Sequence, residues 1–291
     1  MAPDRTLSRE STKAARKKGN GRGKSAPKRG AVTTIQEPAW LVRGAITTII
    51  ALIVWVAFSP VLQNGFVNWD DDANLLENPN YRGLGWRQLS WMFTTFFGGH
   101  YQPLAWVTFG MDYLLWGMQP FGYHLTNLIL HIANALLCYF LALRLFSLAY
   151  PGATEITGLK IRLAGAIAAL LFAVHPLRVE SVAWATERRD VLSGFFIFLT
   201  ILFYLRANSH PGNPARTRWI WAAVVVYGLS LLSKAIGMTI PFVLFGVFRY
   251  LLLIHRHDLG EEPENVLLSD RPILLCVAGW AASAALILSL T

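Results

Sequence analysis

The chain has 291 residues, of which 54% are hydrophobic and only 15% are charged. This balance excludes an ordinary soluble domain and indicates a protein that lies in lipid. The net charge of +9 does not indicate a nucleic-acid partner, because eleven of the 26 Lys and Arg residues lie between Arg5 and Arg43, just before the first apolar run.

Residues 1–40 are rich in Gly, Ser, Pro, Lys and Arg. This composition predicts a disordered, basic tail on the cytoplasmic side of a membrane. The basic stretch is too long for a cleaved signal peptide, and the apolar run that follows lacks a small-residue cleavage site. We therefore expect a retained signal anchor, followed by one polytopic membrane domain over residues 41–291.

Seven nearly uncharged runs approach the length of about 20 residues that a helix needs to cross a bilayer. They are residues 44–62, 125–143, 163–177, 191–205, 219–233, 235–254 and 272–291. We predict about seven spans, some of them short. The last run reaches Thr291 without a polar stop, so we expect the sequence to be a fragment of a longer protein.

The basic residues predict the orientation of the spans. With the N-terminus inside, twenty Lys and Arg residues lie on the inner side and six on the outer side, which is a clear positive-inside bias. Segment 103–118 is apolar but short and contains Asp112, and a crossing here would reverse every later loop. We place it in the outer interface. The expected fold is an all-α integral membrane protein, a multi-span bundle with a large first outer loop that bears interfacial helices.

The first outer loop carries a run of carboxylates directly after the first span. Asp70, Asp71 and Asp72 are adjacent, and His100 follows in the same loop. Neighbouring like charges raise one another's pKa, so one carboxylate is suited to act as a base while another orients an acceptor or a cation. The alternative is a solvated acidic turn that leads into the Asn-Pro-Asn turn at 78–80.

The second outer loop mixes basic and acidic side chains. Segment 175–190 contains Arg178, Glu180, Glu187, Arg188, Arg189 and Asp190, and Lys234 follows at the next outer turn. Arginine donors can bind a phosphate in a bidentate manner. Equally, these cations can pair with the neighbouring carboxylates or extend toward lipid headgroups.

A polar stripe runs along the second span. His124, Asn127, His131 and Asn134 follow a 3-4-3 spacing, which places them on one face of a helix. Such stripes can bond neighbouring helices or ligate a metal. We favour packing, because metal sites usually add carboxylate or thiolate ligands at a compatible spacing.

Taken in order, these motifs resemble the transmembrane and tetratricopeptide-repeat O-mannosyltransferases and their bacterial relatives, which are GT-C class glycosyltransferases. The resemblance covers nearly everything after the tail. It is carried by Asn-Gly-Phe-Val-Asn-Trp-Asp-Asp-Asp at 64–72, Asn78-Pro79, Gly-Tyr-His-Leu-Thr-Asn at 122–127 with His131 and Asn134, His175-Pro176 with Glu180, Arg-Arg-Asp at 188–190, and Ser233-Lys234.

The resemblance implies a GT-C-like bundle whose catalytic element is a pair of acids in the first outer loop. By position these acids map to Asp70 and Asp71, although the register within the triplet stays open. The resemblance also implies that basic and acidic groups of the later loops border the site. The candidate substrate-binding residues are therefore Asp72, His100, Glu180, Arg188, Asp190 and Lys234.

Two departures from the family pattern stand out. Gln102 precedes Pro103 where relatives commonly have Arg or His. The tetratricopeptide repeats that the family carries after its membrane domain are not found in this sequence, and we expect them downstream of it.

The resemblance thus implies transfer of a sugar, with mannose favoured, from a polyprenyl-phosphate donor to a hydroxyl of an exported protein, at Ser or Thr. The expected location is a bacterial inner membrane with the site facing the periplasm. A divalent cation, Mg²⁺ or Mn²⁺, stays open as a cofactor, and no residue is assigned to ligate it. The partners are the lipid-linked donor, the acceptor and membrane lipid, without nucleic acid.

Two rival functions remain. A non-catalytic membrane scaffold that presents tetratricopeptide repeats would tolerate Asp-to-Asn changes in the acidic loop. A transporter of lipid-linked substrates would be expected to bind near the membrane midplane with broken helices, whereas the charges here gather at one edge.

Overall fold

The computed structural model describes residues 39–150, 152, 155–209, 212, 214–239, 242–243, 245–247, 249–250, 253 and 270–290. Of the predicted tail, only its last two residues are among them. The helices are α1 (Ala39–Phe58), α2 (Trp86–Thr94), α3 (Pro103–Trp116), α4 (Pro120–Ala149), α5 (Glu155–Ala173), α6 (Arg178–Ala183), α7 (Arg188–Ala207), α8 (Arg216–Ser233) and α11 (Arg271–Leu290). The described residues contain no strand, and the predicted all-α membrane fold is confirmed.

Three helical segments are long and apolar enough to cross a membrane. They are Trp40–Gln63, Pro120–Ala149 and Arg188–Ala207, with 24, 30 and 20 residues. The runs predicted at 163–177, 219–233 and 272–291 also fold mainly as helices, namely α5, α8 and α11. Much of the run at 235–254 lies outside the described residues, so the number of seven spans stays a prediction.

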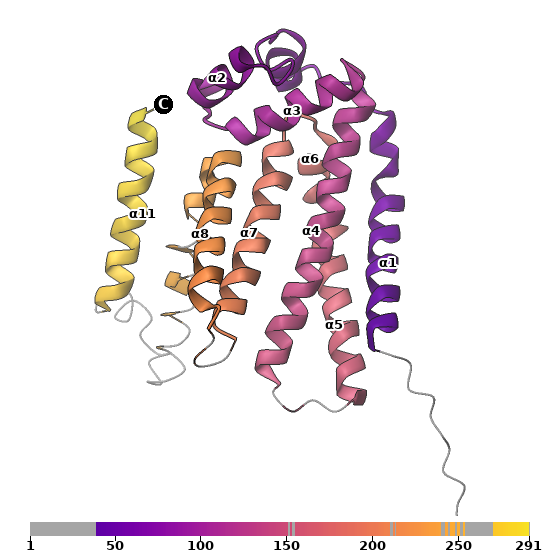
Figure 1. The fold of residues 1–291 in the computed structure, drawn as a ribbon, viewed down its shortest axis with the longest axis vertical. Coiled ribbons are helices and arrows are strands. Elements are labelled where there is room, and N and C mark those ends of the chain that lie inside the picture. The colour runs from indigo at the N-terminus through magenta and orange to yellow at the C-terminus, as the bar shows by residue number, and fades with distance from the viewer. Residues whose placement is uncertain are drawn as a thin grey trace, which may run out of the picture. The chain divides into compact units, whose positions relative to one another are not determined.

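The bundle is centred on α4, which packs against α1, α5 and α7, while α7 also packs against α8 (Figure 1). Its apolar core includes Val54 of α1, Leu128 and Tyr139 of α4, and Ala169 and Ala173 of α5. Alanines at these contacts let the helix backbones approach closely, which is how helices associate in lipid.

A second, largely aromatic core lies under the first outer loop. Tyr81, Trp106, Phe109 and Tyr123 are fully buried there. The rings of Trp106 and Trp91 meet edge to face, with their centroids 5.2 Å apart. This core attaches the loop to the ends of the spans, so that the loop is a packed layer.

Helix α3 lies across the ends of the upright helices in Figure 1. Pro103 occupies the first turn, where its missing N–H costs nothing, and Gly117 ends the helix with a φ of +60°. The crosswise course of α3 agrees with the interfacial position predicted for 103–118. Gly110 lets α3 approach the loop, because a Cβ at this position would lie 2.7 Å from the carbonyl oxygen of Gly83.

The polar stripe of α4 bonds to backbone carbonyls of other segments. The imidazole of His131 lies 2.8 Å from the carbonyl oxygen of Ala173, the last residue of α5. Asn127 donates to Trp184 over 3.0 Å, and Asn134 donates to Val191 over 2.8 Å. The Ala173 carbonyl belongs to the last turn of α5, where it has no partner within its own helix and needs one from another segment. The packing interpretation of the stripe is therefore confirmed.

Candidate active site

The three adjacent aspartates lie in three different environments. Asp71 is fully buried. Its carboxylate accepts hydrogen bonds from the Val67 N–H over 2.9 Å, from the Thr186 N–H over 2.9 Å, and from the Thr186 hydroxyl. Asp71 therefore joins the first outer loop to the second, and both of its oxygens are occupied.

Asp70 and Asp72 are only half-buried. Asp72 begins a π-helical turn that extends over Asp72–Leu76. Asp70 lies near enough to His100 for its charge to act on the imidazole. Of the three carboxylates, Asp70 is thus the one that is both accessible and placed beside another candidate residue.

Arg189 and Lys234 form a network of ion pairs with two carboxylates of the second outer loop. The ammonium group of Lys234, which ends α8, lies 3.3 Å from a carboxylate oxygen of Glu187 and also pairs with Asp190. Arg189 pairs with the other oxygen of Glu187. Asp190 also accepts a hydrogen bond of 3.1 Å from Ser181. The network fixes both cations in place.

The pKa of Glu187 reflects this network. Burial alone would raise it, but the hydrogen bond and charge of Arg189, together with the charge of Lys234, outweigh burial and lower the pKa below its usual value. Glu187 is therefore ionised at neutral pH.

A cavity of about 310 Å³ opens beside the network, and we call it the outer cavity. It is lined by Phe96, Gly99, His100, Tyr101, Gln102, Arg189, Leu231, Leu232, Lys234, Ala235 and Met238. The residues come from the first outer loop, the start of α7 and the end of α8 with the turn after it. Cations and apolar side chains in one cavity fit an amphiphilic anion.

Several polar groups in the wall of the outer cavity could form hydrogen bonds to a ligand. The side-chain oxygen of Gln102 and the Nε–H of Arg189 are buried and have no hydrogen-bond partner among the described residues. Partial burial, and then the positive charges of Arg189 and Lys234, lower the pKa of His100, so its imidazole is neutral at pH 7. Gln102, the departure from the family pattern, thus lies in the cavity wall.

Arg188 is placed differently from the other candidates. It is fully buried and pairs with Asp112 of α3. It also donates to the side-chain oxygen of Asn127 over 2.8 Å and to the carbonyl of Tyr123 over 2.7 Å, and its guanidinium lies 4.5 Å from the ring centroid of Phe109. Arg188 does not line the outer cavity. Instead, the contacts of Arg188 hold α3, α4 and α7 together.

Glu180 also stands apart. Its side chain is exposed and forms no ion pair among the described residues. The nearby Arg178 lies over the ring of Phe172, with 5.0 Å between the guanidinium carbon and the ring centroid. The structure therefore brings His100 and Lys234 together in the lining of the outer cavity, with Asp190 paired to Lys234 and Asp70 within reach of His100 by its charge, whereas Glu180 stays apart.

The donor set does not fit a cation held by the protein alone. Within the described ranges, no three His, Cys, Asp or Glu side chains are arranged to hold a metal ion. We therefore derive no step that passes through a divalent cation.

Comparison with known proteins shows which proteins this chain is similar to. The protein O-mannosyl-transferase TMTC4 of Mus musculus is 33% identical over 177 residues, which cover 59% of this chain and 24% of that protein. The protein O-mannosyl-transferase Tmtc3 of Drosophila melanogaster is 32% identical over 48% of the chain and 16% of its own length. The chain is related to the transmembrane and tetratricopeptide-repeat O-mannosyltransferases. The predicted resemblance is thereby confirmed.

The human O-mannosyl-transferase TMTC3 is similar over a longer stretch, with 29% identity across 66% of the chain and 20% of that relative. The chain thus spans about a quarter or less of the length of these O-mannosyl-transferases. No family model and no solved structure matches it.

Sequence reasoning missed three residues that build this site. Asp112 is conspicuous in the sequence, because it is a carboxylate in an apolar segment, but the sequence indicates only that this segment lies in the interface. Gln102 was noted only as a departure from the O-mannosyltransferase pattern. Thr186 gave no signal at all, since one Thr among the charges of a loop is unremarkable until the fold brings Asp71 to it.

Proposed function

We propose that this chain is the catalytic membrane region of a glycosyltransferase. It transfers a sugar, with mannose favoured, from a polyprenyl-phosphate donor to a hydroxyl group of an exported protein. The observation that carries the proposal is the outer cavity, in which cations and unpartnered polar groups meet apolar side chains, and whose residue His100 lies within reach of the charge of Asp70. The names of the related O-mannosyl-transferases support the choice of sugar and of a protein acceptor.

The cavity suits the phosphate of such a donor. Arg189 and Lys234 supply positive charge, while the Nε–H of Arg189 is a buried donor without a partner. Charged hydrogen bonds to a phosphate are short and strong in such surroundings. The apolar lining residues Leu231 and Leu232 belong to α8 and would lie against the first isoprene units.

Asp70 is the proposed base. Its carboxylate takes the proton of the acceptor hydroxyl while the hydroxyl oxygen attacks the anomeric carbon of the sugar. The new carbon–oxygen bond forms as the bond between that carbon and the phosphate oxygen breaks, with inversion. The electron pair leaves on the lipid phosphate, whose additional negative charge Arg189 and Lys234 stabilise.

Asp71 and Arg188 act as positioning residues in this scheme. Asp71 binds the second loop through Thr186, next to Glu187 of the ion-pair network. Arg188 fixes α3 against α4 and α7 through Asp112 and Asn127. Together they hold the acidic loop and the cations at a set separation, which is what an oriented reaction requires.

The positive-inside pattern supports a site outside the cytoplasm, because the outer cavity lies at the end opposite the basic inner loops. We favour a bacterial inner membrane, with the cavity facing the periplasm. A non-catalytic scaffold is the main rival, and it predicts that no sugar transfer depends on this chain.

The test uses membranes from cells that express the chain, supplied with radiolabelled mannose on polyprenyl phosphate or, separately, on a nucleotide. We expect transfer to protein from the polyprenyl-phosphate donor alone. Lys234→Gln should reduce the rate at least tenfold, while the control Arg87→Gln, an exposed site on α2, should leave it unchanged. The proposal fails if the nucleotide sugar serves directly, or if Lys234→Gln transfers normally.

A further inference from the structure

The opposite end of the bundle carries a larger cavity of about 810 Å³, which we call the inner cavity. Its lining residues are Arg43, Phe140, Leu143, Arg144, Ser147, Leu202, Phe203, Arg206, Ser209, Ala215, Arg218 and Trp219. The four arginines come from four different helices, α1, α4, α7 and α8. Among the residues that the structure describes, no carboxylate belongs to the lining.

This composition differs from that of the outer end. There, Arg188, Arg189 and Lys234 each pair with a carboxylate. At the inner cavity, Arg43, Arg144 and Arg218 form no ion pair within the part of the chain that the structure describes. The like charges of Arg43, Arg144 and Arg218 around one cavity repel one another, and an anion that enters it relieves this repulsion.

Aromatic rings hold two of these arginines in place. The guanidinium carbons of Arg206 and Arg218 lie 4.7 Å and 5.5 Å from the ring centroid of Trp219. The stacked guanidinium of Arg218 presents its N–H groups in the plane of the fork, where an oxygen acceptor can approach them. The inner cavity therefore presents oriented donors, which favours a phosphate over a diffuse cloud of counterions.

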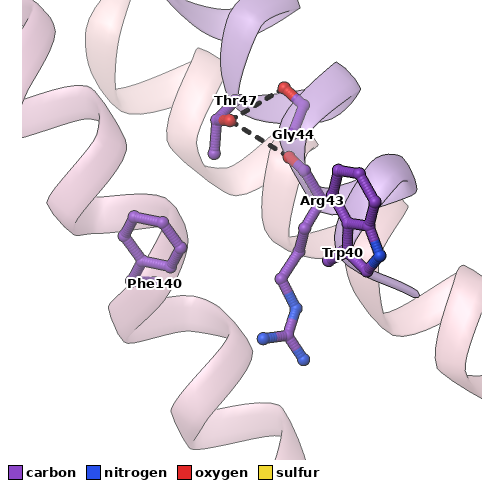
Figure 2. A pocket seen from close by; sticks show the side chains of 5 residues that line it. All are labelled: Trp40, Arg43, Gly44, Thr47 and Phe140. Atoms are coloured by element: carbon purple, nitrogen blue, oxygen red, sulfur yellow. Dashed lines mark hydrogen bonds between the residues drawn. The ribbon is translucent and has the colours of Figure 1, made fainter. Parts of the chain in front are cut away.

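A second hollow of about 560 Å³ adjoins the inner cavity between α1 and α4, and it is lined by Trp40, Arg43, Gly44, Thr47 and Phe140 (Figure 2). Arg43 and Phe140 belong to both linings. In Figure 2 the Arg43 side chain extends between the rings of Trp40 and Phe140. The Thr47 hydroxyl donates to carbonyls of its own helix, at 3.1 Å from Arg43 and 2.9 Å from Gly44. This hollow is largely apolar.

We propose that the two spaces together bind an anionic phospholipid, with the phosphate headgroup among the arginines and an acyl chain in the hollow between α1 and α4. A polar, cationic cavity that continues into an apolar hollow matches an amphiphile, whereas a free phosphate would use the inner cavity alone. Basic pockets between helix ends on the cytoplasmic side are suited to acidic headgroups. This site is separate from the outer cavity and does not depend on the proposed transfer reaction.

The first experiment compares two double variants of the purified full chain in detergent. Arg144→Gln/Arg218→Gln removes two charges from the cavity, and Lys160→Gln/Arg216→Gln removes two from neighbouring exposed positions outside it. Native mass spectrometry measures the binding of phosphatidylglycerol and of phosphatidylcholine with the same acyl chains. We expect preferential binding of phosphatidylglycerol, weakened at least tenfold by the first double variant and less than twofold by the second.

The second experiment separates a lipid from a free phosphate. A Cβ at Gly44 would meet nothing within 4 Å, so Gly44→Leu fits and fills the hollow without removing a charge. We expect this variant to weaken phosphatidylglycerol at least fivefold and to leave binding of inorganic phosphate unchanged. Melting temperature and size-exclusion chromatography check that each variant folds. If a double variant does not fold, the single variant Arg43→Gln is compared with the control Lys160→Gln instead.

Three results would overturn the proposal. Equal losses in the two double variants would mean that surface charge alone attracts the lipid. Equal binding of the two lipids would remove the need for an anionic headgroup. Unchanged phosphatidylglycerol binding in Gly44→Leu, together with full competition by inorganic phosphate, would identify a site for free phosphate.

Discussion

At the scale of single residues, the acidic triplet shows how burial separates neighbours that are alike in sequence. The sequence places Asp70, Asp71 and Asp72 together and leaves the register open. In the structure Asp71 is buried and fully hydrogen-bonded, while Asp70 and Asp72 stay accessible. No local pattern could reveal this, because the partner Thr186 lies 115 residues away along the chain.

Asp71→Asn should therefore destabilise the protein. The change removes the charge that strengthens three hydrogen bonds, and we expect a loss of about 2 kcal/mol with a lower melting temperature. Thermal denaturation in detergent measures it. The control Asp72→Asn, at a half-buried position, should melt like the wild type, and equal melting of all three proteins would show that Asp71 is not an anchor.

The lowered pKa of Glu187 predicts a pH dependence of stability. A carboxyl group with a lowered folded-state pKa stabilises the protein above its unfolded pKa of about 4.3, and this contribution is lost as the pH falls through the folded pKa. Melting temperatures should be higher for the wild type than for Glu187→Gln at pH 7, and the two should converge as the pH falls through the lowered pKa of Glu187. A difference that stays constant from pH 7 to pH 3 would show that the charge of Glu187 adds no stability.

At the scale of elements, α3 was predictable in position but not in its contacts. Its length and aromatic residues placed it in the interface, and its crosswise course in Figure 1 agrees. Its polar contact was not predictable, since the ion pair of Asp112 with Arg188 joins residues 76 positions apart. The sequence therefore predicts that Arg188 borders the substrate, whereas in the structure Arg188 forms a buried ion pair with Asp112 that holds α3 in place.

Gly110→Val should loosen this element. A side chain at this position would collide with the backbone oxygens of Gly83 and Tyr81, at 2.7 Å and 3.0 Å from the Cβ, and backbone cannot move aside cheaply. We expect a loss of about 1–3 kcal/mol, measured by denaturation in detergent. Gly65→Ala is a suitable control, because its Cβ would meet nothing within 4 Å. Normal stability of Gly110→Val would show that α3 does not pack this closely.

At the scale of the whole described bundle, the two ends differ in chemistry. One end carries cations paired with carboxylates around the outer cavity, and the other carries arginines around the inner cavity. Hydropathy predicted most of the described helices, because it follows from local composition, and the orientation given by the positive-inside bias stays a prediction. The cavities could not be predicted, since each is formed by residues from several segments far apart in sequence.

The orientation can be tested by labelling single cysteines. In a background with Cys138→Ala and Cys276→Ala, Trp86→Cys is exposed at the outer end and Asn208→Cys at the inner end. A membrane-impermeant maleimide added to intact bacterial spheroplasts should label the cysteine at 86, and label the one at 208 only after permeabilisation. The reverse pattern would place the outer cavity in the cytoplasm.

The most direct test of the account is the rate of sugar transfer by Asp70→Asn, measured with the polyprenyl-phosphate donor and membranes that contain equal amounts of each protein. We predict that Asp70→Asn loses at least a hundredfold in rate while it melts like the wild type, and that Asp72→Asn keeps most of its activity. Full transfer by Asp70→Asn would contradict the assignment of the base, and with it the mechanism proposed for the outer cavity.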